Sequence, residues 1–267
     1  MGVRYGQVFL KDQNIIHKII HSISDKSVSE IVEIGCGDGI LTEALLPHCN
    51  QLHVIEIDQA CIDACKARLG EKQQRVTFHH QDVLTLDLNS ILSKKVSIVA
   101  NVPYYLSAPL IKWLVKQRHL LSECILMFQL EVVDKYCAKP ASKTYTSLSV
   151  YTQFYFEVSK LFHVSRNCFR PIPNVESAVI KILRKDKLPE VDESQFFAMV
   201  RSCFWARRKT IKRALLDSPY LSINKQCMQD THFDIFQDKR GEILTLQEFL
   251  NLYACVKPFI KKVHIKN

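Results

Sequence analysis

Two hydrophobic patterns alternate along the chain as far as residue 183. Short runs of apolar and β-branched residues are typical of buried strands, and an apolar residue every three or four positions is typical of an amphipathic helix. The predicted strands are 29–34, 52–55, 75–79, 96–100, 124–128 and 178–183, and the Tyr-, Phe- and Val-rich segment 148–164 predicts further strands. The predicted helices are 14–23, 41–46, 60–69, 108–116 and 130–138. Because strands and helices alternate, we predict an α/β fold with a mostly parallel central sheet.

A charged, proline-containing stretch at 184–190 interrupts these patterns. Beyond it the apolar residues recur with helical spacing, and the predicted helices are 193–205, 209–216 and 246–255. Domain boundaries commonly fall in such polar stretches. We therefore predict two domains, residues 1–185 and residues 186–267, of which the second is small and all-helical.

The first predicted strand runs directly into the glycine-rich turn 35–39 (Gly-Cys-Gly-Asp-Gly), which a helix follows. Strand, glycine-rich turn and helix open a nucleotide-binding βαβ unit, although a glycine cluster alone is a weak signal. Glu56 ends the next strand, 21 residues after Gly35. An acidic residue at that position can accept hydrogen bonds from both hydroxyls of a ribose. The glycine-rich turn and Glu56 together therefore favour a nucleotide-type ligand.

Polar residues also follow the next two predicted strands. Asp82 comes after strand 75–79, and Asn101 comes directly after strand 96–100. The carboxyl ends of parallel strands form the ligand-binding edge of an open α/β sheet. Asp82 could accept a hydrogen bond from the amino group of an adenine there, or it could simply cap a helix or turn. Four polar features at four consecutive strand ends favour the binding interpretation.

Residues 101–104 (Asn-Val-Pro-Tyr) carry the candidate chemistry. The amide oxygen of Asn101 can accept a hydrogen bond from an exocyclic amine. Pro103 fixes φ and has no N–H, which makes the turn stiff. Tyr104 offers a flat face on which a base can stack, whereas the alternative is a strand end and a Tyr packed on the core.

The composition is that of a globular protein, with 47% of the 267 residues hydrophobic and 24% charged. The net charge of +9 favours an anionic partner, nucleic acid before a membrane. No apolar run reaches transmembrane length, and residues 1–13 contain no signal-peptide core, so we expect a cytoplasmic protein without a membrane partner. None of the ten cysteines forms a Cys-x-x-Cys pair, so we expect reduced thiols and no bound metal.

One stretch of the second predicted domain is strongly basic. Between residues 201 and 213 there are six basic residues and no acidic one: Arg201, Arg207, Arg208, Lys209, Lys212 and Arg213. A charge run is commonly a solvated face. Because this run adjoins Phe204 and Trp205 and the whole protein is basic, it favours a surface that faces RNA or DNA.

Taken together, these motifs resemble the ribosomal RNA adenine N6-dimethyltransferases of the KsgA type. The matching segments, in the order of the family, are 6–10, 33–39, 56–58, 101–104, 169–179, 207–211 and 240–244. In the family they look like the N-terminal motif, the S-adenosylmethionine loop, the ribose clamp, the catalytic Asn-Leu-Pro-Tyr, the loop over the target base and two C-terminal motifs. Val8, Cys36 and Tyr105 depart from residues common in the family, which are Asn or His, Pro, and Asn.

The resemblance implies a Rossmann-like class I methyltransferase with S-adenosylmethionine as cofactor. The implied reaction is N6,N6-dimethylation of two adjacent adenosines in the 3′-terminal hairpin of small-subunit (16S) rRNA during ribosome biogenesis, with the immature small subunit as partner and a monomeric enzyme. Residues 1–185 would then bind the cofactor and carry catalysis, and residues 186–267 would bind RNA. The implied catalytic residues are Asn101, Val102, Tyr104 and Phe169. The implied cofactor-binding residues are Val8, Leu10, Gly35, Gly37, Glu56, Asp82, Val83 and Asn101. The implied RNA-binding residues are Arg207, Arg208, Lys209, Lys212 and Arg213.

Within this reading, the Asn101 amide oxygen and the Val102 carbonyl accept the N6 hydrogens of an adenine that has left its stack. Tyr104 and Phe169 hold the two faces of that base. Phe169 could instead be a core anchor for a stiff proline-rich loop, but we favour a lid over the base.

Two other functions remain open. Methyltransferases of the Erm type, which act on large-subunit RNA, share the core motifs, and segments 207–211 and 240–244 favour the small-subunit enzyme. A non-catalytic RNA-binding or assembly factor could keep the same fold. The combination of Glu56, Asp82 and Asn101 argues against that, because a pure binding protein has no use for it.

Overall fold

The computed structural model describes residues 8–24 and 30–264. Gly6 and Gln7 of the predicted N-terminal motif, and Ser29 of the first predicted strand, lie outside the described residues. The chain forms two compact units. The first comprises Met1–Val133 and Phe156–Arg184, and the second comprises Asp134–Tyr155 and Lys185–Asn267.

This division differs from the predicted boundary in one respect, because residues 134–155 pack with the C-terminal region. The Tyr155 hydroxyl donates to Glu193 at 2.6 Å, and the Tyr145 hydroxyl donates to the Leu244 carbonyl at 2.9 Å. Phe154 packs against the ring of Phe196, with ring centroids 5.3 Å apart. These long-range contacts, which no local pattern announces, place 134–155 in the second unit.

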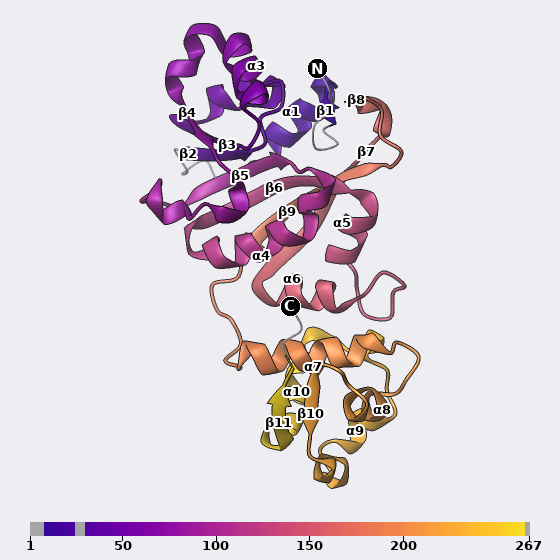
Figure 1. Ribbon diagram of the computed structural model, residues 1–267. Coiled ribbons are helices and arrows are strands. Elements are labelled where there is room, and N and C mark those ends of the chain that lie inside the picture. The colour runs from indigo at the N-terminus through magenta and orange to yellow at the C-terminus, as the bar shows by residue number, and fades with distance from the viewer. Residues whose placement is uncertain (1–7, 25–29, 265–267) are drawn as a thin grey trace. The chain divides into compact units, whose positions relative to one another are not determined.

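A seven-stranded sheet organises the first unit, in the order β4-β3-β2-β5-β6-β9-β7 (Figure 1). The strands are β2 (Glu30–Ile34), β3 (Gln51–Glu56), β4 (Val76–His80), β5 (Val96–Asn101), β6 (Leu121–Gln129), β7 (Phe156–Val164) and β9 (Ser177–Arg184). The neighbouring strands β4, β3, β2, β5 and β6 pair in parallel, whereas β9 is antiparallel to both β6 and β7. This arrangement confirms the predicted α/β fold with a mostly parallel sheet.

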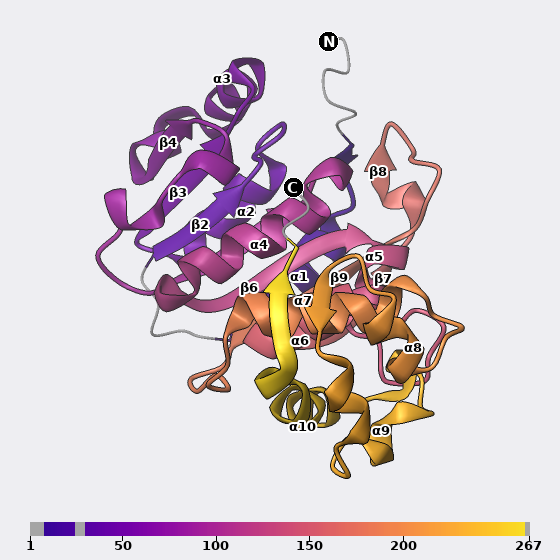
Figure 2. The ribbon, with the colours of Figure 1, turned by 60° about the horizontal axis from the view of Figure 1, so that its bottom comes forward.

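Four helices follow strands or loops of this unit: α1 (Gln13–His21), α2 (Ile40–Leu45), α3 (Gln59–Leu69) and α4 (Ser107–Gln117). Helix α4 packs against the sheet at β6 (Figure 2), and α5 (Leu130–Tyr136) begins directly after that strand. A two-stranded antiparallel pair, β1 (Phe9–Leu10) with β8 (Phe169–Arg170), joins segments about 160 residues apart. This pair brings the N-terminal motif to the proline-rich loop.

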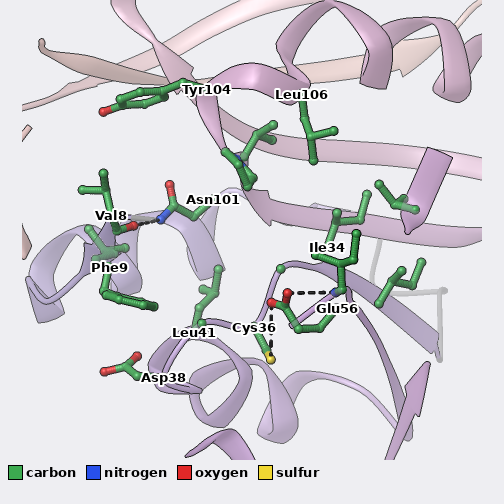
Figure 3. Close-up of a pocket in the computed structure, with 18 of the residues that line it drawn as sticks. Val8, Phe9, Ile34, Cys36, Asp38, Leu41, Glu56, Asn101, Tyr104 and Leu106 are labelled. Atoms are coloured by element: carbon green, nitrogen blue, oxygen red, sulfur yellow. Dashed lines mark hydrogen bonds between the residues drawn. The ribbon is translucent and has the colours of Figure 1, made fainter. Parts of the chain in front are cut away.

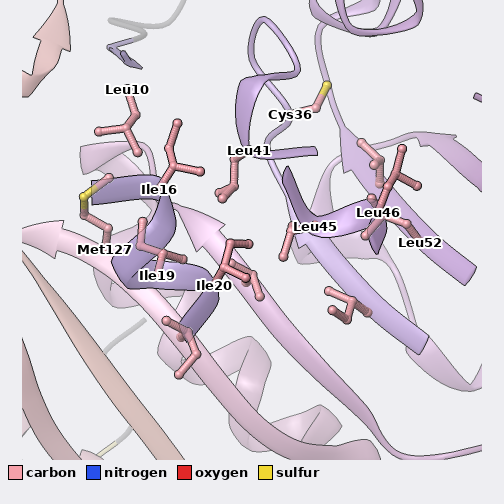
Figure 4. Close-up of a cluster of buried hydrophobic side chains, with 14 of the residues drawn as sticks. Leu10, Ile16, Ile19, Ile20, Cys36, Leu41, Leu45, Leu46, Leu52 and Met127 are labelled. Atoms are coloured by element: carbon pink, nitrogen blue, oxygen red, sulfur yellow. The ribbon is translucent and has the colours of Figure 1, made fainter. Parts of the chain in front are cut away.

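Helix α1 shows how the sequence builds the core beside that pair. Asp12 caps its N-terminus, because its carboxylate accepts the backbone N–H groups of residues 14 and 15. Ile16, Ile19 and Ile20 recur at helical spacing and are buried. They join a hydrophobic cluster that also contains Leu10, Leu41, Leu45, Leu46, Met127 and Phe169 (Figure 4). The cluster therefore fixes β1 and the first turns after β2.

Two predictions about the secondary structure were wrong. The segment 148–164 is not all strand, because α6 spans Ser147–Tyr155 and only β7 is extended. Tyr, Phe and Val favour strands in isolation, but burial of Val150 and Phe154, four residues apart on one helix face, decides the structure. The second unit also contains a short antiparallel pair, β10 (Leu221–Ile223) with β11 (Ile260–Val263). These strands are too short to show a pattern in the sequence.

Three helices of the second unit match the predicted helices 193–205, 209–216 and 246–255: α7 (Glu193–Trp205), α8 (Ile211–Leu216) and α10 (Leu246–Val256). Helices α6 and α9 (Asp234–Gln237) were not predicted. Helix α8 begins at residue 211 because Thr210 has an extended conformation at its N-cap. Thr245 and Glu248 form a reciprocal capping box at the start of α10. Among the helices of the described ranges, none combines the length and the apolar character that a membrane crossing needs.

Candidate active site

An open cavity lies at the carboxyl ends of β2, β3 and β5 in the first unit (Figure 3). Every residue predicted for catalysis or cofactor binding lines it. These residues are Val8, Leu10, Gly35, Gly37, Glu56, Asp82, Val83, Asn101, Val102, Tyr104 and Phe169. They come from segments up to 161 residues apart, and the parallel sheet brings their ends to one edge.

The glycine-rich turn needs glycine for two separate reasons. At Gly37, φ is +54° and a Cβ atom would lie 2.9 Å from the ring of Phe9, so a side chain would collide with β1. At Gly35, φ is +79° and a Cβ atom would meet only the Asn101 carbonyl oxygen, at 4.0 Å. A side chain at Gly35 would therefore occupy open space in the cavity. The turn thus leaves room for a ligand to approach its backbone.

Glu56 is held rigidly at the end of β3 and is only 6% exposed. Its Oε1 atom accepts hydrogen bonds from the backbone N–H groups of Ile57 and Asp58, at 2.8 and 2.9 Å. Oε2 is approached by the Cys36 thiol, a weak donor at 3.8 Å. One oxygen therefore fixes the carboxylate, and the other is available to the hydroxyls of a ligand.

Asp82 caps a turn and also lines the cavity, so the two roles weighed from the sequence do not exclude each other. Its Oδ1 atom accepts the N–H of Leu84 at 2.9 Å and so caps the short helical turn Val83–Thr85. Asp82 and Val83 nevertheless line the cavity. Because the cap uses one carboxylate oxygen, Oδ2 remains able to accept a hydrogen bond from a ligand.

The orientation of the Asn101 amide is determined by Val8. The Asn101 Nδ2 atom donates to the Val8 carbonyl oxygen at 3.1 Å, and Oδ1 points away from that bond (Figure 3). A carbonyl can only accept, so the nitrogen must face it. Val8, which stands where the family commonly has Asn or His, therefore positions Asn101 through its backbone. The partners lie 93 residues apart, so no local pattern could reveal this bond.

The two aromatic residues have different surroundings. Tyr104 is half-buried at the cavity, and burial raises the pKa of its hydroxyl, which therefore stays protonated near neutral pH. Phe169 is 1% exposed, pairs with Leu10 through β8 and β1, and belongs to the hydrophobic cluster. Of the two roles weighed for Phe169, this packing favours the core anchor over the lid.

A buried carboxyl group lies beneath the glycine-rich turn and was not singled out from the sequence. Glu33, on β2, is fully buried, and this burial raises the pKa of its carboxyl well above the ordinary value. Burial therefore favours the protonated form of this carboxyl group. The only signal in the sequence was an acidic residue flanked by the apolar residues Val32 and Ile34 of the strand.

The basic residues predicted to bind RNA fall into two groups within the second unit. Arg207 forms an ion pair with Glu242 at 2.9 Å and donates to the Lys143 carbonyl at 3.2 Å. Lys209 pairs with Asp217 at 2.9 Å, and Lys212 bonds the side chain of Gln237. Arg208 and Arg213 are exposed. These two are the members of the group whose charges most directly face solvent.

The sheet, the glycine-rich turn and the acidic residue at the end of β3 are typical of an α/β domain that binds a nucleotide-type cofactor. A family model described as "Ribosomal RNA adenine dimethylase" matches residues 2–257. The chain therefore belongs to the ribosomal RNA adenine dimethylase family, and it is a methyltransferase whose methyl donor is S-adenosylmethionine.

Individual relatives agree with this assignment. The chain is 37% identical to "Ribosomal RNA small subunit methyltransferase A" of Bacillus licheniformis, over 91% of this chain and 87% of the relative. It is 36% identical to the protein of the same name from Clostridium botulinum, over 94% and 92% of the two chains. The crystal structure of a dimethyladenosine transferase from Plasmodium falciparum superposes with a TM-score of 0.81 at 27% identity, over 94% of this chain and 99% of that one. The 23S rRNA methyltransferase ErmE shares the fold, with a TM-score of 0.71 at 20% identity over 93% of this chain and 99% of that one.

Proposed function

We propose that this protein transfers methyl groups from S-adenosylmethionine to N6 of two adjacent adenosines in the 3′-terminal hairpin of small-subunit rRNA. The observation that carries the proposal is the orientation of the Asn101 amide at the edge of the cavity. Its nitrogen donates to the Val8 carbonyl, and its oxygen points away from that hydrogen bond. The similarity to the small-subunit enzymes named above supports this RNA as the substrate. With ErmE, the 23S rRNA methyltransferase, the chain shares only the fold.

The cavity fits the cofactor at three points. The free Oε2 of Glu56 accepts the ribose hydroxyls, the free Oδ2 of Asp82 accepts the adenine amino group, and Gly35 lets the remainder of the molecule approach the backbone. Val8, Leu10 and Val83 provide apolar walls. When bound, S-adenosylmethionine supplies a methyl group on a sulfonium centre.

Asn101 and Val102 act on the target amine. The N6 lone pair of adenine is delocalised into the ring, so the nitrogen is a poor nucleophile. When the Asn101 Oδ1 atom and the Val102 carbonyl accept the two N6 hydrogens, the nitrogen is biased toward a tetrahedral form and its lone pair is oriented. The backbone N–H of Val102 donates to Met127 at 3.0 Å, which fixes this segment to β6. The contribution is alignment and electrostatic preorganisation rather than base catalysis.

The target base must leave its stack to reach these acceptors. Tyr104 offers one face on which it can lie, and the stacking contributes on the order of 1–3 kcal/mol. Phe169 supports the other side of the cavity from within the hydrophobic cluster. The described residues 101–105, which line the cavity around the Asn101 amide, carry no charged side chain, which is compatible with a second transfer to a singly methylated N6.

The second unit is proposed to bind the RNA backbone. Arg208 and Arg213 are assigned to phosphate contacts, because their side chains are exposed. Lys209 and Lys212 add positive charge beside them, whereas Arg207 mainly fixes the loop through Glu242. We propose that the enzyme acts as a monomer in the cytoplasm, where bacterial ribosomal subunits are assembled.

The direct test is mass spectrometry of ribosomal RNA after incubation with the protein and labelled S-adenosylmethionine. Unmethylated small subunits and large subunits serve as parallel substrates. We expect dimethyladenosine at two adjacent positions near the 3′ end of the small-subunit RNA and no label in the large-subunit RNA. Label confined to large-subunit RNA would support an enzyme of the Erm type, and RNA binding without any label would support an assembly factor.

A further inference from the structure

Trp205, the last residue of α7, is 43% exposed, whereas the other tryptophan of the chain, Trp113, is buried. The Trp205 ring is nevertheless held in place. Its indole N–H donates to the Ala214 carbonyl of α8 at 3.1 Å, and the Lys209 Nζ atom lies 5.4 Å from the ring centroid. The structure therefore keeps a large, flat apolar surface in solvent in one defined orientation.

This arrangement suits stacking. A base can lie on any aromatic face, and the interaction tolerates every base because each has a π face. The bond to Ala214 fixes the indole before a ligand arrives, so little side-chain entropy is lost on binding. A buried role alone would not need a ring with so much exposed surface.

The charges around Trp205 indicate which ligand it takes. Arg208 lies in the turn that follows Trp205, and Arg213 precedes Ala214, to which the indole is bonded; both are exposed. Lys209 also lies beside the ring, although Asp217 partly neutralises it. An aromatic face beside a net positive charge complements a nucleic acid, in which bases alternate with phosphates.

We propose that Trp205 is a stacking platform for an unpaired base of the bound RNA, with Arg208 and Arg213 contacting the phosphates on either side. The inference rests on the proposed RNA-binding function of the second unit, and it adds a residue to which that function assigned no role. The contact reads no base edge, so it contributes affinity and register rather than sequence specificity.

Tryptophan fluorescence of the full-length protein tests this directly, because Trp205 is the exposed one of two tryptophans. The probe is a transcript of the unmethylated 3′-terminal region of small-subunit rRNA, and inorganic polyphosphate is the control polyanion without bases. We expect the RNA to quench the Trp205 emission and polyphosphate to bind with little quenching. In Trp205→Phe, where Trp113 alone emits, the quenching should disappear.

Affinity measurements complete the test. Trp205→Ala should lower RNA affinity roughly 5- to 150-fold, the range expected for one stacked base, and Trp205→Phe should retain most of the wild-type affinity. Ile235→Ala is the matched control, because Ile235 is 66% exposed in the same unit but lies on α9. It should bind RNA like the wild type.

The results separate this proposal from the function on which it rests. If the wild type binds and methylates small-subunit RNA but its emission does not change, the stacking proposal is wrong and the proposed function stands. The same holds if Trp205→Ala, folded by its melting curve, binds RNA with wild-type affinity. If the emission shifts to the blue only in the presence of a ribosomal protein, the surface binds protein instead. A wild-type protein that neither binds nor methylates the RNA would contradict the proposed function itself.

Discussion

Replacing Phe169 by alanine distinguishes a structural role from a role in holding the base. Phe169 is 1% exposed and packs in the hydrophobic cluster with Leu10 and Ile16. Truncating a phenylalanine in such a position typically costs about 3–5 kcal/mol, because transfer energy is lost and a cavity remains. For a unit of this size each kcal/mol lowers the melting temperature by about 2–4 °C. We therefore expect Phe169→Ala to melt roughly 6–20 °C below the wild type.

The assay is a thermal melt combined with a methylation rate on the same preparation. Ile172→Ala is the matched control, since Ile172 lies three residues away but is 58% exposed, and it should melt close to the wild type. Phe169→Leu should recover most of the stability because it refills most of the volume. A melting temperature within about 2 °C of the wild type, together with lost methylation, would refute the packing argument and restore the lid over the base.

Three further changes test other parts of the account. Glu56→Gln should weaken S-adenosylmethionine binding by about 1.5–3 kcal/mol in calorimetry, because the amide keeps one oxygen for the backbone but loses the second acceptor; unchanged affinity would exclude the ribose contact. Neutralising Arg208 and Arg213 together should lower the slope of RNA affinity against salt by about two, whereas Arg207→Gln should mainly reduce the melting temperature; equal slopes for the double variant and wild type would show a merely solvated face. Burial raises the pKa of Glu33, so its folded form holds a proton that the unfolded chain releases above about pH 4.3. Stability is then lost as pH rises from that value through the folded pKa, and Glu33→Gln should unfold with a weaker pH dependence in chemical denaturation.

Much of the first unit could be predicted because its information is local. Most of the parallel strands contain a short apolar run, and Gly35, Glu56, Asp82 and Asn101 lie at or just after the ends of their strands. The four residues predicted at successive strand ends, Gly35, Glu56, Asp82 and Asn101, all line the same cavity. The family resemblance added the reaction, which residue spacing alone does not contain.

The remaining features depend on partners far away in the sequence. Asn101 is oriented by Val8 across 93 residues, and Arg207 is paired with Glu242 across 35. Helix α6 was mistaken for strand because its composition favours strand, and its burial against α7 decides otherwise. Packing of Phe169 likewise depends on β1, which a reading of its own loop cannot show. Local patterns place residues at an edge of the sheet, but tertiary contacts decide which atoms remain free for a ligand.

The central claim is that the Asn101 amide oxygen accepts a hydrogen from the reacting amine. It is tested most directly by single-turnover methylation of small-subunit RNA by Asn101→Ala, with labelled S-adenosylmethionine at saturation and cofactor affinity measured by calorimetry on the same sample. We predict a rate lower by roughly 10²–10³-fold, as for the loss of one preorganised hydrogen-bonding group at a reacting centre, with cofactor affinity nearly unchanged. A wild-type rate in the folded variant would contradict the claim.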